Sequence, residues 1–556
     1  MLSALSGCSN TNQPAAESAA PTVETETPQT TDTTTEPEQP SEPAAPAIDE
    51  IVIGTTSVIE TAVRDEYNYD MLASGVSELP LVYQDTEGQY HPLMAAYETE
   101  DAATWTFTIA DGMTWSDGEP VTAEDILFTL EYADKNGSAN FVEQTGDDGK
   151  VTSAKYTAFD LSEDNRSISL TLASANVREL SNMTSFRVMP KHIYEGKETI
   201  TEADARVGCG PYMFESFNKE AGTISFVVDP NYPTMPNVAK ITYRLFGNED
   251  TMYMALEQGD IDMVWSYSTG VSAAYQDVLA ASEQVTLANI PAANAPTVLA
   301  FNNANGPFTN EDLRKAVASA LDYEAFKTYL GSQYAETPNA GFVPSTTVGY
   351  TQTAKLETNL DTAAQYMEAA GYTKNADGFY ADANGTVLSF TLTHRADREN
   401  QTGAAELVKT QLEAFGIQVA LEPLDGDSYN AKTSNKFSEN NITMEAALYG
   451  YTAAGMGMGN GLATIYVDGS HAVQGGCQVY DEQFTAIRDE MSAAVTIEAY
   501  NAAAEKMQAY YAEHLPLVAL YWDNMMYAYS AAFENVTIDY VFGLNNVNNW
   551  FTITEK

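Results

Sequence analysis

Cys8 is the residue whose type and setting point to a specific reaction. It closes the tetrapeptide Leu5-Ser6-Gly7-Cys8, in which an aliphatic residue and two small residues precede a cysteine. This is the pattern of a lipobox, where the thiol receives a diacylglyceryl group and a peptidase that needs small neighbouring side chains cuts before the cysteine. We expect residues 1–8 to be the end of a lipoprotein signal and Cys8 to carry the lipid.

Residues 9–47 are rich in Pro, Thr and acidic residues and contain no Lys, Arg or aromatic residue. Such a segment cannot bury enough apolar surface to fold. We expect it to be a disordered tether between the lipid and the folded chain.

Patterns that indicate catalysis or a resident metal are missing from the sequence. The five histidines form no i, i+4 pair and there is no Cys-x-x-Cys, which argues against a zinc site. No phosphate-binding G-x-x-x-x-G-K-[ST] and no G-x-S-x-G occurs, and the run Gly455 to Gly461 does not fit G-x-G-x-x-G. Among 78 acidic residues, a pair of carboxylates is not a signal. We expect no enzyme, no catalytic residue, no metal site and no cofactor.

The net charge argues against a nucleic-acid-binding protein, and the lengths of the apolar runs argue against a membrane-spanning one. Lys and Arg number 26 and Asp and Glu 78, so the net charge is −52 and would repel nucleic acid or an anionic membrane surface. No apolar run reaches the ~18 residues that would span a bilayer. The 556 residues suffice for three to four domain-sized units, at roughly 150 residues each. Beyond Cys8, Cys209 and Cys477 are expected to be buried free thiols, although a pairing stays open.

Periodicity and turn residues place the elements of the N-terminal half. The folded part begins near Ile48 with a buried strand at residues 51–54. Apolar residues alternate with Thr over residues 105–109, which predicts a half-buried strand. Thr122 and Asp125 form a variant capping box that starts a helix.

The C-terminal half carries start and stop signals for further elements. They are a second capping pattern from Thr309 to Asp312, a short helix capped by Asp361 and ending at Gly371, a hairpin turn at Asn384-Gly385 and a helix closed by Gly416. A strand at 388–392, a helix at 407–415 and a strand at 417–421 follow one another. This β–α–β order predicts an α/β fold with a partly parallel sheet.

Five segments, taken together and in order, resemble the peptide/nickel-binding (family 5) extracytoplasmic solute receptors of ABC importers. The most specific runs from Trp105 to Asp125 and contains the turn Trp115-Ser116-Asp117-Gly118. The others are Gly208 to Tyr212 (with Cys209 where the family usually has Thr), Ala255 to Asp262, Phe308 to Asp322 and Leu515 to Tyr521.

The resemblance implies a two-lobed α/β periplasmic-binding-protein-like fold, of the large three-subdomain type, with a hinge between the lobes. Residues 48–90, 200–294 and 523–556 would form a discontinuous lobe I, 91–199 an extra subdomain and 295–522 lobe II. The motif residues Asp117 and Thr122 would be structural and not touch the ligand.

The same resemblance places the ligand-contacting residues. The segment after Asp262 implies Trp265, Ser266 and Tyr267 as cleft residues, with core packing of Trp265 as the alternative. The strand end implies Arg395, with a surface salt bridge as the alternative. The aromatic-rich loop implies Tyr449 and Tyr451.

One departure from the family bears on the ligand. Peptide receptors carry an Asp for the ligand's ammonium group where this chain has Ala454 and Gly455. Either Glu60 or Asp468 supplies that charge, or the ligand has no free amine there. Met456 and Met458 are alternative contacts for an apolar or metal-chelate ligand.

The function implied is a monomeric receptor held by its lipid on the outer face of the bacterial cytoplasmic membrane. It would pass a peptide or peptide-like ligand to the permease and ATPase subunits of an ABC importer. The alternatives are a surface sensory or adhesive protein on the same fold, and a receptor for a non-peptide solute such as a metal chelate.

Overall fold

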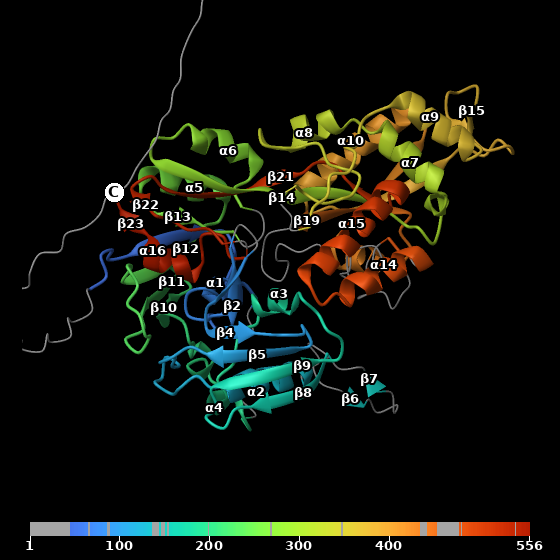
Figure 1. Ribbon diagram of the computed structural model, residues 1–556. Helices are drawn as coiled ribbons and strands as arrows, with labels where there is room; N and C mark the ends of the chain where they lie inside the picture. Colours follow the sequence, from blue (N-terminus) through green and yellow to red (C-terminus); the bar gives the residue numbers. More distant parts are fainter. Residues whose placement is uncertain are drawn as a thin grey trace, which may run out of the picture. The chain divides into compact units, whose positions relative to one another are not determined.

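Strands from both halves of the chain join one 11-stranded sheet in the computed structural model (Figure 1). Its strands, in spatial order, are β10 (Tyr212–Asn218), β11 (Thr223–Val228), β12 (Lys240–Leu245), β1 (Ile51–Thr55), β13 (Met263–Val264), β21 (Asp523–Ser530), β14 (Val285–Phe301), β19 (Ala446–Thr452), β17 (Ser389–Arg395) and β18 (Gln418–Leu424). Strand β20 (Leu517–Ala519) also pairs with β14. The α/β prediction is confirmed.

The structure describes residues 45–64, 67–85, 89–135, 144–145, 151–152, 155–197, 200–266, 270–345, 349–433, 442–452, 477–479, 481–539 and 541–556. The chain divides into two units, residues 1–44 and 45–556, and the first lies wholly outside the described residues. The expectations for Cys8, Tyr267, Met456, Met458 and Asp468, and nearly all of the tether, therefore fall outside them, as does the side chain of Tyr451.

The protein is two-lobed, and β14 belongs to both lobes. Its first half pairs with β21 as far as Asn294, opposite Asp523; from Asn294 onward it pairs with β19, and from Val298 also with β20. We call the part of the sheet from β10 to β21 lobe I and the part from β19 to β18 lobe II.

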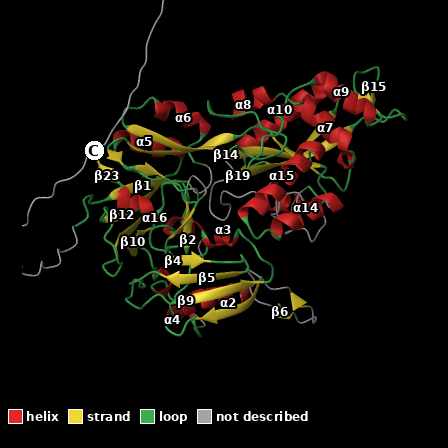
Figure 2. Ribbon diagram, in the orientation of Figure 1, coloured by secondary structure: helices red, strands yellow, loops and turns green. Residues whose placement is uncertain are grey.

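Helices cover both faces of lobe II. Because side chains alternate along a strand, Leu299 and Phe301 of β14 pack with α7, α9 and α10, whereas Val298 and Ala300 pack with α14 and α15. The helices of lobe II are α7 (Glu311–Ala320), α8 (Tyr323–Leu330), α9 (Leu360–Ala369), α10 (Glu399–Phe415), α11 (Gly426–Thr433), α14 (Glu482–Ser492) and α15 (Ile497–His514); a hairpin of β15 (Thr373–Lys374) and β16 (Tyr380–Ala381) adds to it (Figure 2).

Lobe I repeats this layering. Ile51 and Ile53 of β1 pack in one core, and Val52 lies against a second core on the other face. The helices that cover it are α1 (Tyr67–Ala73), α5 (Glu249–Gln258), α6 (Ala273–Ala280) and α16 (Val547–Thr552), and β22 (Phe533–Glu534) pairs with β23 (Thr554–Glu555).

A separate four-stranded sheet and its own core form the extra subdomain. Its strands are β4 (Ala95–Glu98), β5 (Thr104–Ile109), β9 (Ser167–Leu172) and β8 (Tyr156–Leu161), with α2 (Ala123–Lys135), α3 (Glu179–Met183) and α4 (Lys191–Tyr194); two small ribbons, β2 (Val82–Gln84) with β3 (Tyr90–Pro92) and β6 (Gln144–Thr145) with β7 (Val151–Thr152), adjoin it. The predicted strand at 105–109 is confirmed within β5, where side chains alternate between buried and half-buried.

Three predicted helix starts need correction. At the first, the Asp125 carboxylate accepts from the N–H of Thr122 as expected, but the Thr122 hydroxyl also donates to it, so the Asp125 N–H bonds to the Thr122 carbonyl instead. The caps of the other two helices are Asn310 and Asn359, whose side chains accept the N–H of the second or third residue beyond them. Asparagine competes well with Thr and Asp at this position, and the predictions of Thr309 and Asp361 were wrong.

The predicted β–α–β order is confirmed, although α10 begins at Glu399, before the residues expected for that helix. Strands β17 and β18 pair in parallel on either side of α10, and Gly416 ends that helix in the left-handed conformation with φ of 115°. Cys209 and Cys477 are both free and buried, as expected. Among the described helices, none is long and apolar enough to cross a membrane.

Candidate functional site: the strand ends at the lobe junction

The parallel strands of both lobes point toward the junction between them. In lobe I, β1 and β12 run parallel to β13, which is antiparallel to β21; β21 is antiparallel to β14. These strands therefore run in the direction of β14, toward lobe II. In lobe II, β17 and β18 run parallel to β19, which is antiparallel to β14, so they run toward lobe I.

The carboxyl ends of these strands form what we call the junction-side edges. They are the segments that follow Thr55, Leu245 and Val264 in lobe I and those that end at or follow Arg395, Leu424 and Thr452 in lobe II. In open α/β sheets the carboxyl ends of parallel strands are where ligands bind. The residues Glu60, Trp265, Ser266, Arg395 and Tyr451 all lie on or just beyond these strand ends, and Tyr449 lies three residues before one.

Trp265 is held by lobe I. Its N–H donates to the carbonyl of Gly54 at 2.8 Å, and its ring packs edge-on against Tyr243 with centroids 6.4 Å apart. The residue is 5% exposed. The indole thus stabilises the core, and the next residue, the half-buried Ser266, is the more accessible of the two.

Glu60 forms an exposed ion pair. The ammonium group of Lys219, just beyond β10, lies 2.5 Å from its carboxylate, and both side chains are about two-thirds exposed, at 63% and 66%. Exposed pairs of this kind contribute little to stability. The negative charge of Glu60 is therefore balanced by Lys219, and its side chain is accessible to solvent.

Arg395 ends β17 and is clamped by an aspartate that the sequence analysis did not single out. Its Nε donates to Asp397 Oδ1 at 2.7 Å and its Nη2 donates to Oδ2 at 2.5 Å. This hydrogen bonding lowers the pKa of Asp397 to about 2 and raises that of Arg395. The Arg-x-Asp spacing was the available signal, because a side chain two residues beyond a strand end can turn back to it.

Gly426, at the start of α11, lets the backbone approach the Arg395 guanidinium. A Cβ on this glycine would lie 3.0 Å from Arg395 Cζ. Asp425, beside it, adds a second negative charge near the arginine and raises its pKa further. At the lobe II edge the Arg395 guanidinium thus lies near two carboxylates, those of Asp397 and Asp425.

Tyr449 lies in the core of lobe II. Its hydroxyl donates to the carbonyl of Thr433 at 2.7 Å, and its ring lies edge-on to Tyr429 at 6.0 Å. Burial raises its pKa well above the usual value. Tyr449 therefore packs in the core of lobe II next to the strand end. Tyr451, whose backbone pairs with Ala295, lies nearer the junction.

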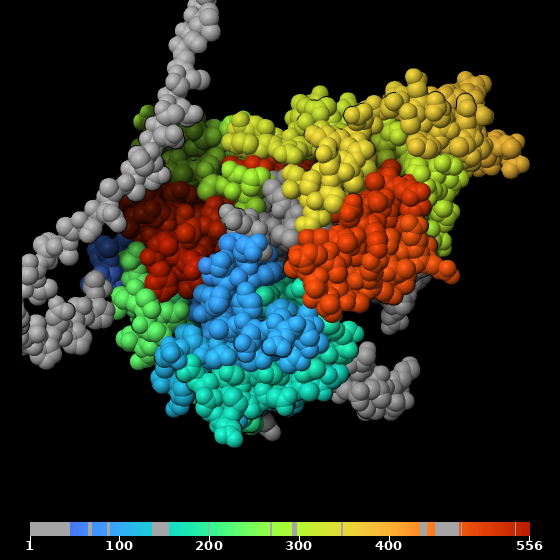
Figure 3. All heavy atoms as spheres, in the orientation of Figure 1, coloured from blue at the N-terminus to red at the C-terminus, as the bar shows by residue number. Residues whose placement is uncertain are grey.

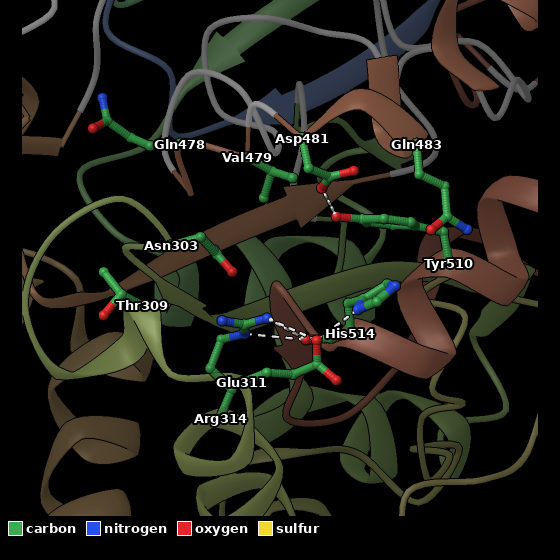
Figure 4. Close-up of a pocket in the computed structure, with 10 residues that line it drawn as sticks. All are labelled: Asn303, Thr309, Glu311, Arg314, Gln478, Val479, Asp481, Gln483, Tyr510 and His514. Atoms are coloured by element: carbon green, nitrogen blue, oxygen red, sulfur yellow. Dashed lines mark hydrogen bonds and ion pairs between the residues drawn. The ribbon is translucent and has the colours of Figure 1, made fainter. Parts of the chain in front are cut away.

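A pocket of about 430 Å³ lies at the opposite end of the lobe II strands (Figure 4). Its lining residues are Asn303, Thr309, Glu311, Arg314, Gln478, Val479, Asp481, Gln483, Tyr510 and His514. It sits beyond the end of β14 and before the start of β20, so the junction-side edges are at the other ends of these strands. Sequence reasoning missed it because its residues are spread over three separate segments.

The charged groups of this pocket bind one another. Glu311 accepts from His514 Nδ1 at 2.6 Å and from Lys315, and although burial opposes it, these bonds lower its pKa. The Arg314 guanidinium donates to the carbonyls of Phe308 and His514. Asp481 caps α14 and accepts from the Tyr510 hydroxyl. The arrangement joins α7, α14 and α15.

No described part of the chain gathers three or more His, Cys, Asp or Glu side chains that could hold a metal ion. A bare metal would therefore find no ready set of protein ligands in the described residues, whereas a solute that brings its own polar groups would meet the side chains of the two edges.

Comparison with known proteins assigns this arrangement to a family. The model of bacterial extracellular solute-binding proteins, family 5, matches residues 89–470, more than half of the chain. The chain belongs to this family. The expected family is thus confirmed, and four of the five segments lie within the matched residues.

Curated relatives of this solute-binding protein include the nickel-binding periplasmic protein of Escherichia coli, 25% identical over 63% of the chain, and a probable D,D-dipeptide-binding protein of the same organism, 26% identical over 59%. The matched segments span 66% and 59% of those two proteins. A probable peptide ABC transporter periplasmic-binding protein of Sinorhizobium fredii is 22% identical over 80% of the chain and 83% of its own length.

Solved structures share the two-lobed fold. NikA of Brucella suis, in complex with Fe(III)-EDTA, has a TM-score of 0.73 at 16% identity over 91% of this chain and 100% of its own. CtaP of Listeria monocytogenes, an ABC transporter substrate-binding protein, has a TM-score of 0.72 at 20% identity over 92% and 99%. AppA of Bacillus subtilis, in complex with a nonapeptide, has a TM-score of 0.67 at 18% identity over 92% and 100%.

Proposed function

We propose that this protein is an extracytoplasmic receptor that captures a peptide or peptide-like solute between its lobes and delivers it to an ABC importer. The observation that carries the proposal is the convergence of the junction-side edges, each lined by the strand ends where an α/β sheet binds ligands. A ligand that touches both lobes stabilises the conformation in which they are close.

The charges at the edges favour a solute with both an ammonium and a carboxylate group. On lobe II, Arg395 offers a guanidinium and Asp397 and Asp425 offer carboxylates. On lobe I, the ion pair of Glu60 among the described residues is with the exposed Lys219. A charged group enclosed between lobes requires an opposite charge, and a zwitterionic peptide finds both signs here. Ser266 and Tyr451 are proposed as further contacts.

A thermal-shift screen tests this proposal. Short peptides with free termini should raise the melting temperature, because saturation at about a hundred times the dissociation constant adds about 2.7 kcal/mol to stability. Acetylated peptides should give smaller shifts if an ammonium group is bound. Arg395→Ala should weaken binding by about 2 kcal/mol or more, since a ligand carboxylate would lose its partner, and the matched control Arg488→Ala, on the surface of α14, should not.

The screen also separates the alternatives. Names of relatives include nickel-binding and Fe(III)-EDTA-bound proteins, so nickel–histidine and iron–EDTA chelates belong in the same plate. Shifts from chelates but from no peptide would replace the peptide proposal with a chelate receptor. Our proposal includes no catalytic step, so mass spectrometry should recover the bound solute unchanged.

We further propose that a lipid on Cys8 is the attachment to the membrane, with residues 9–47 as the tether. The lipobox and the composition of that segment support this. Expressed behind a full lipoprotein signal peptide, Cys8→Ala should move the protein to the soluble fraction with unchanged ligand affinity, because acyl chains supply the membrane affinity. A variant that stays with membranes after a salt wash would contradict the anchor.

A further inference from the structure

The extra subdomain contacts lobe II at a place separate from β14 and β21. The N–H of Val177 donates to the carbonyl of Ala494 at 3.3 Å. The Val177 side chain packs against the core of the subdomain and also against the core of lobe II. On the face shown in Figure 3, the blue-to-teal surface of the subdomain lies beside the orange surface of the α14–α15 region.

A second contact adjoins the first. The guanidinium of Arg178, half-buried at the start of α3, lies over the ring of Tyr500 with 5.3 Å between Cζ and the ring centroid. Tyr500 belongs to the first turn of α15 and is 4% exposed. A cation over a buried aromatic face is attracted to it, more strongly where water is excluded.

The residues on each side of this contact are hydrogen-bonded within their own part of the molecule, the subdomain or lobe II. On the subdomain, the N–H of Asn176 donates to the carbonyl of Ala102 at 2.8 Å and the Asn176 side chain accepts from the N–H of Arg178 at 3.0 Å. On lobe II, Thr496 caps α15 through the N–H of Ala499. The contact therefore joins two packed bodies rather than one loose loop to a surface.

Lobe I and lobe II, which carry the junction-side edges, are thus connected at two places. The sheet passes from lobe I to lobe II through β14, with β20 and β21 beside it. The subdomain, inserted into lobe I between β1 and β10, reaches lobe II again through Val177 and Arg178. Separating the lobes would break this second link while leaving the strands intact.

We propose that Val177 and Arg178 on the subdomain and Ala494 and Tyr500 on lobe II form a clasp that holds the lobes together, and that the subdomain serves to slow the escape of the captured solute. The part of this proposal that concerns solute rests on the proposed function, whereas the effect on lobe separation does not. A contact present in one conformation and absent in the other shifts the population toward the first.

The lobe separation can be measured without any ligand. Spin labels at Glu163→Cys on the subdomain and Ala383→Cys on lobe II, both exposed sites, report the distance between the two bodies by pulsed dipolar spectroscopy. Cys8 is replaced by Ala in all of these proteins, and the native Cys209 and Cys477 are buried and should stay unlabelled. Arg178→Ala and Tyr500→Leu should each raise the ratio of long-distance to short-distance molecules by about three- to tenfold.

Two variants keep this test specific. Tyr500→Phe retains the ring and should leave the ratio within about twofold of the parent. Arg488→Ala removes an arginine from α14 that pairs only with its neighbour Asp489 among its described ion pairs, and should leave the distance distribution unchanged. Distances that do not change in Arg178→Ala and Tyr500→Leu would overturn the clasp.

A disulfide gives an independent readout. In Val177→Cys/Ala494→Cys the two backbones are already hydrogen-bonded, so mild oxidation should form an intramolecular bond and remove the long-distance molecules. A folded double variant that does not crosslink would overturn the proposal. If no peptide shifts the melting temperature but the variants change the spin-label distances as expected, only the proposal of a peptide solute is refuted. If peptides shift the melting temperature but the distances do not change in the variants, only the proposed clasp is refuted.

Discussion

The segment from Trp105 to Asp125 and the junction-side edges differ in what their polar atoms bind. In the first, the Asp125 carboxylate accepts from the N–H and the hydroxyl of Thr122 and from the N–H of Lys191 at 2.8–2.9 Å. At the edges, Arg395 is held by an exposed aspartate two residues on. The polar atoms of the first segment are bonded within the fold, whereas the charged groups at the edges have exposed partners that a ligand can replace.

The largest effect should come from the close backbone approach at Gly210, two residues beyond Gly208, whose carbonyl accepts from the N–H of Ser116 in the first segment. In Gly210→Ala the new Cβ would lie 2.2 Å from the carbonyl oxygen of Val76 and 2.8 Å from the carbonyl carbon of Ser77. Backbone atoms cannot give way as a flexible side chain can, so the variant should lose about 3 kcal/mol of stability. The midpoint of urea denaturation and the melting temperature measure this loss.

Gly247→Ala is the matched control. This glycine follows β12 in lobe I, and a Cβ there meets nothing within 4 Å. Its stability should change by no more than about 0.5 kcal/mol. Equal losses in the two variants would show that the loss in Gly210→Ala does not come from its close approach to Val76 and Ser77.

Sequence alone predicted the fold where local rules and packing agree. The alternation at residues 105–109, the Asn384-Gly385 turn and the β–α–β order were correct because each is determined by nearby residues. The helix starts at Thr309 and Asp361 were misplaced by one or two residues, since Asn310 and Asn359 can cap as well. Boundaries depend on small differences between competing caps.

The site was predictable only as a set of positions. Strand ends at 265 and 395 follow from the order of elements, and the structure brings them to the same junction. Whether Trp265 and Tyr449 face the ligand or the core depends on their packing with Tyr243 and Tyr429. These two tyrosines belong to other elements of the chain, β12 and α11. Such tertiary contacts cannot be predicted from the residue pattern of a single sequence.

Asp539 shows how a buried carboxylate differs from those at the edges. It is 4% exposed and accepts the N–H groups of Val541 and Phe542, and burial raises its pKa to about 7. The folded state therefore keeps a proton that the unfolded state releases near pH 4, so stability should fall as pH rises from about 4 to about 7. Asp539→Asn should remove most of this decline.

Urea denaturation at several pH values tests this expectation. The asparagine oxygen can accept the same N–H groups, so the turn should persist. Asp425→Asn is the control, because Asp425 also accepts backbone N–H groups, from Asp427 and Ser428, but is exposed. Parallel stability curves for Asp539→Asn and the parent between about pH 4 and pH 7 would contradict the buried, protonated state.

The smallest effect should occur at Asp397, on the lobe II edge. The Arg395 guanidinium lowers its pKa to about 2, so the carboxyl carbon should titrate there by NMR, and in Arg395→Ala near the ordinary value of about 3.9. The stabilisation by this pair is complete above about pH 4 and is lost as pH falls through about 2; being exposed, it should amount to less than about 1 kcal/mol. A solute carboxylate that replaces Asp397 on Arg395 should raise the pKa of Asp397. An unchanged Asp397 titration in the presence of a peptide that shifts the melting temperature would show that the peptide does not replace Asp397 on Arg395.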